Sequence, residues 1–339
     1  MAFMLAMLPF NASAYWVLVW NDEFNGTSLD TTKWVWDTGN NNGWGNQELE
    51  YYTGRTNNLS VGDGVLHITA RKESMNGYNY TSGRIKSYQR FFRTYGRFEI
   101  RARLPKGLGF WPALWMLPAD VSVYGPWPAS GEIDIMENRG SELTKVQASV
   151  HYGAKTNHQS YTAFASFPSS NNTTNFHIYA LEWAADRISM YVDDKLYASV
   201  SSWWSSGGPF PAPFDTKFYI LMNLAVGGTY VGSPSITTIN NGTVFPGEMQ
   251  VDYVRAYRYS DFAPPPLDIT ATSAGPGELQ IFADNGPPRA LCYVLFSTNP
   301  ALPMTSWLRL TTNQFNGVGV LNTNIPAADQ PGAYRLQIP

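Results

Sequence analysis

The sequence predicts an all-β protein: a two-sheet jelly-roll sandwich whose concave face forms a substrate cleft, followed by a small β-sandwich-like module. Apolar and polar residues alternate with a period of two along many short stretches, as in antiparallel strands that turn one face to a core. No stretch has a sustained helical period, and 29 Gly and 23 Pro among 339 residues separate the stretches. The clearest stretches are GVLHITARK (64–72), RFEIRARL (97–104), KVQASVHYG (145–153), FHIYALEW (176–183), RISMYVDD (187–194), KFYILMNLAV (217–226) and MQVDYVRAYRY (249–259).

The N-terminal segment, residues 1–14, has the pattern of a secretion signal. It is mainly apolar and ends in small residues, like the apolar core and cleavage site of such a signal. Because it is too short to cross a bilayer, we expect a secreted protein, extracellular or periplasmic, with no membrane span. The alternative is an ordinary N-terminal strand or tail, since the basic start of a signal is missing.

A proline-rich segment, FAPPP at 262–266, predicts a domain boundary. Three consecutive prolines favour a stiff polyproline II spacer over a strand. We therefore expect a jelly roll at 15–261 and a small β module at 267–339. The module gathers no carboxylates, histidines or row of aromatic residues, so an accessory or anchoring role is expected for it.

Composition indicates a neutral partner. The net charge is -3, charged residues make up 14% of the chain, and no run of Lys or Arg is present, so neither a nucleic acid nor an acidic membrane is expected to bind. The 12 Trp and 20 Tyr suit a sugar polymer, whose C–H faces stack on aromatic rings. The single cysteine, Cys292, lies in an apolar run and predicts a buried, inert thiol.

Three acidic residues, Glu132, Asp134 and Glu137, stand within one otherwise apolar strand, SGEIDIMEN. Along a regular strand Glu137 would point to the opposite face from the other two, into the core, where a carboxylate is costly. One extra residue, a bulge at Ile135 or Met136, would return Glu137 to their face.

The bulged strand predicts the chemistry of a retaining glycosidase. Four strand steps between the two glutamates, less the inward lean of their side chains, leave carboxyl groups about 5 to 6 Å apart, as in retaining enzymes. Glu132 is the predicted nucleophile, and Glu137 is the predicted acid and base. Asp134 is expected to hydrogen-bond the nucleophile and to raise the pKa of its neighbours by like-charge repulsion.

The segment SGEIDIMEN resembles the catalytic signature of glycoside hydrolase family 16 in its bulged, laminarinase-like form. The resemblance covers about residues 16–259 and implies a β-jelly roll with a cleft on its concave face, acting as an endo-β-1,3-glucanase. It also implies the roles given above for the three acidic residues. Further segments similar to that family are VWNDEFNG, WGNQELEYYT (44–53), YTSGRIKS (80–87), YGRFEIRARLPKGLGFWPALWML (95–117), LMNLAVGG (221–228) and MQVDYVRAY (249–257).

Three tryptophans are candidates for stacking on sugar. Trp111 and Trp115 share one face of GFWPALWML, and Trp127 stands on a Pro-rich loop five residues before Glu132. The alternative is a core tryptophan for Trp111 and Trp115 and a loop anchor for Trp127.

Polar candidates complete the predicted site. His151, on the strand after the acidic one, could bond a sugar hydroxyl or a catalytic carboxylate, or could be structural. The resemblance places four more polar residues in or near the cleft: Arg84, Asn46, Glu48 and Asn223. For Arg84 and Glu48 a surface ion pair is the alternative.

The resemblance also implies a structural calcium ion on the convex side, with Glu23, the backbone of Gly64 and Asp252 as candidate ligands. The alternative treats these as ordinary turn and strand residues. No cofactor is required for the two-carboxylate mechanism.

The substrate is the least determined part of the prediction. After LAVGG the family often has a Trp, whereas this chain has Tyr230 nearby. Mixed-linkage β-glucan and agar-type galactan remain alternatives, and so do transglycosylation and a non-catalytic β-glucan-binding protein. We expect a monomer.

Overall fold

The computed structural model describes residues 15–260, 268–275, 277–284, 291–299, 306–314, 320–326 and 333–337. Residues 20–256 belong to one compact unit, and residues 1–19 and 257–339 belong to a second. The predicted secretion signal at 1–14 and the predicted linker at 262–266 lie outside the described residues, so both stay predictions.

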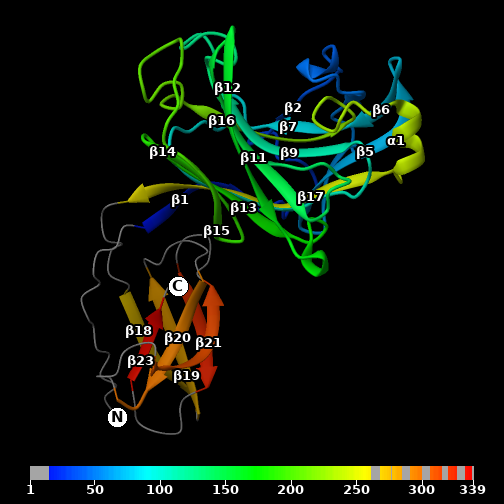
Figure 1. The fold of residues 1–339 in the computed structure, drawn as a ribbon. Coiled ribbons are helices and arrows are strands. Elements are labelled where there is room, and N and C mark those ends of the chain that lie inside the picture. Colours follow the sequence, from blue (N-terminus) through cyan, green and yellow to red (C-terminus); the bar gives the residue numbers. More distant parts are fainter. Residues whose placement is uncertain are drawn as a thin grey trace. The chain divides into compact units, whose positions relative to one another are not determined.

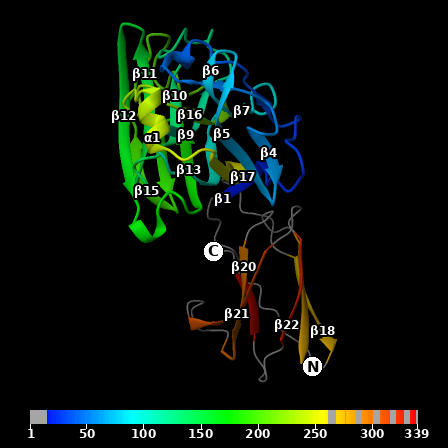
Figure 2. The same ribbon diagram turned by 90° about the vertical axis from the view of Figure 1, so that its right-hand side faces the viewer.

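Two large sheets carry most of the strands (Figure 1). The ten-stranded sheet runs in the order β15 (Lys195–Val200), β14 (Arg187–Val192), β13 (His177–Ala184), β8 (Gly96–Arg103), β17 (Gly247–Ser260), β5 (Val65–Met75), β6 (Tyr78–Ser82) and β3 (Glu50–Tyr52), with β1 (Tyr15–Asp22) paired to β17 and β4 (Leu59–Gly62) paired to β5. The seven-stranded sheet runs in the order β12 (Asn157–Ser166), β11 (Lys145–Ala154), β10 (Glu132–Glu137), β9 (Phe110–Pro118), β16 (Phe218–Val226), β7 (Arg84–Lys86) and β2 (Val35–Trp36). Figure 2 shows β9 to β12 side by side.

The helical segments of the described residues are short. They are η1 (Gly43–Gly45), η2 (Ser169–Asn171) and α1 (Ile236–Gly242). Within the described ranges, no helix has both the length and the apolar character that crossing a bilayer requires.

The core of the large unit follows from the alternation in the sequence. All seven alternating stretches form strands, namely β5, β8, β11, β13, β14, β16 and β17. On β11, for example, Val146, Ala148 and Val150 enter the core, whereas the residues between them face the other side of the sheet. Burying one large apolar side chain stabilises the fold by about 1.5–3 kcal/mol, so each strand turns its apolar face to the core. The opposite face of the strand is then the one that can contact a ligand.

The second unit contains two three-stranded sheets. One consists of β18 (Asp268–Gly275), β19 (Glu278–Asp284) and β22 (Leu321–Pro326), and the other consists of β21 (Leu308–Gln314), β20 (Leu291–Ser297) and β23 (Ala333–Gln337). Leu279, Ile281, Val294 and Ile325 from both sheets form a small core, in agreement with the predicted β-sandwich-like module. Cys292 is buried and free, which confirms the predicted buried thiol, and burial raises the pKa of that thiol to about 11, which disfavours its reactive thiolate form.

Candidate active site

The acidic strand, β10, contains the predicted bulge. Against β9, Asp134 pairs with Trp115 and Met136 pairs with Leu114, so Ile135 is the additional residue. The register against β11 shifts at the same place. The bulge is therefore confirmed, at one of the two positions that the alternation predicts.

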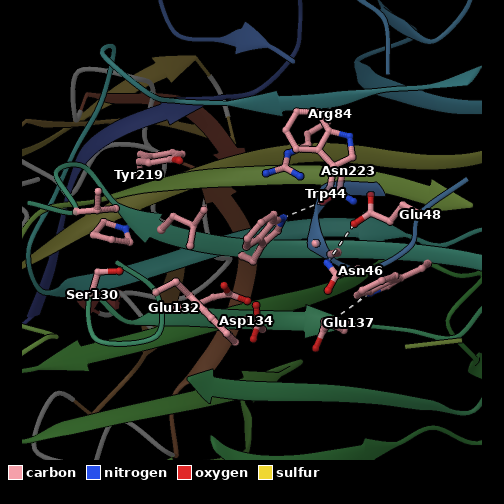
Figure 3. Close-up of a pocket in the computed structure, with 18 residues that line it drawn as sticks. Trp44, Asn46, Glu48, Arg84, Ser130, Glu132, Asp134, Glu137, Tyr219 and Asn223 are labelled. Carbon is pink, nitrogen blue, oxygen red and sulfur yellow. Dashed lines mark hydrogen bonds between the residues drawn. The ribbon is translucent and has the colours of Figure 1, made fainter. Parts of the chain in front are cut away.

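The bulge sorts the side chains of β10 onto two faces. Three apolar side chains are fully buried in the core: Ile133, Ile135 and Met136. The three acidic side chains, Glu132, Asp134 and Glu137, line a cleft on the opposite face of the sheet (Figure 3). Without the extra residue Glu137 would have entered the core, so the cleft geometry depends on this irregularity.

The cleft has a volume of about 380 Å³ and lies over β10, β9, β16 and β7 and the loop at 44–48. Seven of the eight predicted sugar-binding residues line it: Trp111, Trp115, Trp127, Arg84, Asn46, Glu48 and Asn223. The eighth, His151, lies beside the cleft in contact with one of the acids. The lining of the cleft thus joins residues from five separate segments of the chain.

Glu137 is held between the strands on either side of it. The indole N–H of Trp111 donates to Glu137 Oε1 at 3.0 Å, and the side-chain amide of Gln147 donates to Glu137 Oε2 at 3.4 Å. Trp111 is therefore neither a plain core residue nor a free platform, because its N–H is directed at a carboxyl group.

The three carboxyl groups share an environment that favours their protonated forms. Burial first, and then the charge of Asp134, raise the pKa of Glu132 to about 8. Burial, with the charges of Asp134 and Glu132, raises the pKa of Glu137 well above its ordinary range, and the Trp111 N–H opposes part of this rise. Burial also raises the pKa of Asp134, which is hydrogen-bonded to Glu132. Carboxyl protons are therefore available in the cleft near neutral pH.

His151 contacts the acidic group from β11. Its Nε2 lies 3.1 Å from Asp134 Oδ2, and its Nδ1 lies 2.9 Å from Nε2 of His158, whose ring packs 4.6 Å from that of Trp127. Ligand atoms of Glu132, Asp134 and His151 come within 4.8 Å of one another, close enough to hold a metal ion. An ion there would occupy the carboxylates, and hydrolysis by two carboxyl groups requires no metal.

Arg84 lies in a stack of aromatic rings. Its guanidinium is 4.5 Å from the ring of Trp44 and 4.9 Å from that of Trp115, and its Nε is 3.0 Å from Asp37 Oδ2. The alternative of a surface ion pair between Arg84 and Glu48 is wrong, because both residues are buried and Arg84 pairs with Asp37 instead.

Glu48 and Asn223 belong to one hydrogen-bond network behind the cleft. Glu48 accepts from the hydroxyl of Tyr52 at 3.0 Å and from the amide of Asn46 at 3.2 Å. Asn223 donates to Tyr52 at 3.0 Å and accepts from the indole N–H of Trp115 at 2.8 Å. These bonds fix the ring of Trp115 in the cleft wall, so the alternative of a core tryptophan is wrong at this position.

The predicted calcium ligands have protein partners. Both oxygens of Glu23 accept from Arg255, at 2.9 and 2.8 Å, and Asp252 is paired with Arg101. Gly64 takes a left-handed conformation, with φ at 75°, before β5. In this arrangement the two carboxylates do not fit a calcium site unless an arginine releases one of them. Calcium binding stays a prediction, and no step below depends on it.

Several cleft residues escaped prediction. They are Trp44, Ser130 and Tyr219 in the lining, with Gln147 and His158 in contact with predicted residues. The alternation could have found two of them, because Tyr219 shares a strand face with Asn223 and Gln147 shares one with His151. Trp44 and His158 carry no such signal, since each reaches the site from a loop or hairpin.

Comparison with known proteins agrees with this geometry. The model of glycosyl hydrolases family 16 matches residues 45–255. The chain belongs to this family. This family 16 member is 45% identical over 261 residues to glucan endo-1,3-beta-glucosidase A1 of Niallia circulans, covering 71% of the chain but only 38% of that relative. It is 44% identical over 257 residues to a beta-glucanase of Rhodothermus marinus, covering 72% of the chain and 86% of that relative.

A solved structure extends the similarity to the fold of this family 16 chain. The laminarinase from Rhodothermus marinus superposes with a TM-score of 0.64 at 42% identity, covering 73% of the chain and 99% of the laminarinase. The likeness supports the predicted jelly roll.

Proposed function

We propose that this chain is a retaining endo-β-1,3-glucanase that cleaves laminarin-type glucans. The observation that carries the proposal is the bulge at Ile135, which turns Glu132 and Glu137 toward one cleft with Asp134 between them. Laminarinase and endo-1,3-glucosidase are the names of relatives and solved structures that the chain matches over most of its large unit.

In the first half of the proposed reaction, a carboxylate oxygen of Glu132 attacks the anomeric carbon. Glu137 gives its proton to the departing glycosidic oxygen, so that the leaving sugar departs as a neutral alcohol. Asp134 is hydrogen-bonded to Glu132, so it can take over the proton that the two groups share when Glu132 attacks as the anion. The high pKa of Glu137 suits this role, since the acid must hold its proton near neutral pH.

In the second half, the Glu137 carboxylate takes a proton from a water molecule as that water attacks the anomeric carbon. The ester bond to Glu132 breaks, and its electron pair returns to the carboxylate. Two displacements restore the original anomeric configuration. The Trp111 and Gln147 donors keep Glu137 aimed at the same point in both halves.

The buried polar residues that line the cleft are suited to hold the part of the glucan that becomes covalently bound to Glu132, because that part must stay in place between the two displacements. Trp115 offers a ring of fixed orientation for a pyranose face. Arg84 and Asn46 supply hydrogen-bond donors to hydroxyl groups, and the cleft contains no charge pattern that requires a sulfated sugar. A neutral, laminarin-type substrate is therefore favoured over a sulfated galactan.

A substrate panel tests the proposal. We expect wild-type protein to release reducing ends from laminarin much faster than from lichenan or agarose, and Glu132→Gln to lose nearly all turnover while it still binds laminarin. Faster cleavage of lichenan or agarose would move the specificity to mixed-linkage glucan or galactan. Binding without turnover by the wild type would favour a non-catalytic glucan-binding protein.

Export belongs to the same proposal, because a glucan polymer is met outside the cytoplasm. The N-terminal sequence of protein recovered from the culture medium or periplasm is expected to begin near Tyr15. Protein that retains residues 1–14 there, or that stays in the cytoplasm, would contradict a cleaved signal.

A further inference from the structure

The cleft face of the seven-stranded sheet continues past the acidic strand. β11 and then β12, the edge strand, lie on the side of β10 away from the 380 Å³ cleft. Their cleft-facing side chains form what we call the β11–β12 ledge, defined by Gln147, Ser149, Thr162 and Phe164. These four residues have no part in the lining of the cleft described above.

Strand register aligns the ledge with the acidic residues. Glu137 pairs with Gln147, which pairs with Phe164, so the three form one row across three strands. Because neighbouring strands are about 4.8 Å apart, Phe164 stands roughly 10 Å from Glu137 along that row. That span leaves room on the ledge for sugars next to the scissile bond.

Hydrogen bonds show that these side chains share the cleft face. The Gln147 amide donates to Glu137 at 3.4 Å and to the Ser149 hydroxyl at 3.0 Å, and the hydroxyls of Ser149 and Thr162 are 3.2 Å apart. The Ser149 hydroxyl is buried and joins the two others, so the ledge offers a ligand the Gln147 amide and the exposed Thr162 hydroxyl.

Phe164 is the apolar member of the ledge. Its neighbours Ala163 and Ala165 pack against the core, whereas Phe164 itself is 48% exposed. The ammonium group of Lys145 lies 3.9 Å from the centre of the ring, on one of its faces. An exposed ring beside the amide of Gln147 and the hydroxyl of Thr162 suits a pyranose face and its hydroxyl groups, with the second face of the ring left for the sugar.

We propose that the β11–β12 ledge binds the sugars on the leaving side of the scissile bond, with Phe164 as their stacking platform, and then binds an acceptor sugar. This inference rests on the proposed function. The glycosyl part must stay in place on Glu132 between the two displacements, which suits the buried polar cleft. The leaving sugar must depart and be replaced, which suits the open ledge.

An acceptor on the ledge would lead to transglycosylation. Its hydroxyl oxygen forms the new bond to the anomeric carbon, the bond from that carbon to Glu132 breaks, and the hydroxyl proton passes to the Glu137 carboxylate. The electron pair of the broken bond returns to Glu132. Water and acceptor thus compete for one intermediate, and the ledge raises the share taken by the sugar.

The test uses the full chain and laminari-oligosaccharides labelled at the reducing end. In Phe164→Ala the share of transglycosylation at high oligosaccharide concentration is expected to fall about three- to tenfold, as the loss of one stacking contact implies. Cleavage is also expected to move toward the labelled end, so that labelled products become shorter. Phe164→Tyr keeps an aromatic ring, so its share of transglycosylation and the length of its labelled products are expected to be close to those of wild type.

Leu196→Ala is the matched control, because Leu196 is an exposed apolar residue on β15 of the other sheet. It is expected to change neither property. If Phe164→Ala matches wild type in both, or if its labelled products become longer, the ledge proposal is overturned while the proposed function stands. If wild-type protein cleaves no oligosaccharide, the proposed function fails and the ledge fails with it.

Discussion

The hydroxyl of Tyr197, on β15 of the ten-stranded sheet, donates to the main-chain carbonyl of Ile135, 3.0 Å away on β10 of the other sheet. Ile135 is the residue that the bulge adds to the acidic strand, and a bulge leaves its extra residue outside the regular ladder. Tyr197, on the opposite sheet, thus gives the carbonyl group of Ile135 a hydrogen-bond donor. The position of Ile135 in the bulge is what directs Glu137 into the cleft.

Tyr197→Phe tests this support. Leaving the Ile135 carbonyl without its donor is expected to lower the free energy of unfolding by about 1–3 kcal/mol and to lower kcat, since Glu137 loses its fixed position. Denaturant unfolding and laminarin kinetics measure the two effects. The control is Tyr191→Phe, which removes a hydroxyl bonded to Glu182 on the ten-stranded sheet and is expected to leave kcat unchanged. Equal kcat values for the two variants would refute the role of Tyr197.

Trp111→Phe tests the hydrogen bond to the proposed acid. The indole N–H stabilises the charged form of Glu137 and so lowers its pKa. Its removal is expected to raise that pKa and to move the alkaline limb of the pH profile of kcat to higher pH, with a lower maximum. Trp203→Phe is the control, because that indole donates to the Pro211 carbonyl. An alkaline limb that stayed in place or moved to lower pH in Trp111→Phe would contradict the assignment.

Arg84→Lys tests the stack between Trp44 and Trp115. Lysine keeps the charge but loses the flat guanidinium that the two rings sandwich, so we expect the KM for laminarin to rise about tenfold. Arg103→Lys changes an exposed arginine that lies 5.3 Å from Phe176 and serves as the control. The idea fails if both variants keep the wild-type KM.

Glu132→Gln is expected to be more stable than wild type at pH 8. The pKa of Glu132 is raised in the folded state, so its favourable contribution is complete below the unfolded pKa of roughly 4.3 and is lost as the pH rises to about 8. The Tm gain of the variant should therefore grow between pH 5 and pH 8. Thermal unfolding of Glu142→Gln, whose side chain is 42% exposed, gives the baseline. A gain that shrank with rising pH would contradict the burial of this carboxyl.

The sequence was sufficient for the strands and for the acidic residues because both depend on local alternation. In a regular strand the carboxylate of Glu137 would enter the core, and this conflict predicts the bulge. The apolar residues next to Glu132 and Asp134 indicate which face of the strand is buried. The two-sheet fold followed from the same pattern repeated along the chain.

Contacts between distant segments could not be predicted in this way. Tyr197 and Ile135 lie 62 positions apart, and nothing in either stretch indicates that a hydroxyl and a carbonyl will meet. The pairing of Arg84 with Asp37 likewise arises only when β7 and β2 come together, and its stacking on Trp44 only when the loop at 44–48 joins them. The alternative of an ion pair between Arg84 and Glu48 was wrong for this reason.

Covalent trapping tests the central assignment most directly. Incubation with an activated 2-deoxy-2-fluoro laminari-oligosaccharide, which slows the second displacement, is followed by proteolysis and peptide mass spectrometry. We predict one glycosyl adduct, on Glu132, and none in Glu132→Gln. An adduct on Asp134 or Glu137, or a first product of inverted anomeric configuration, would contradict the account.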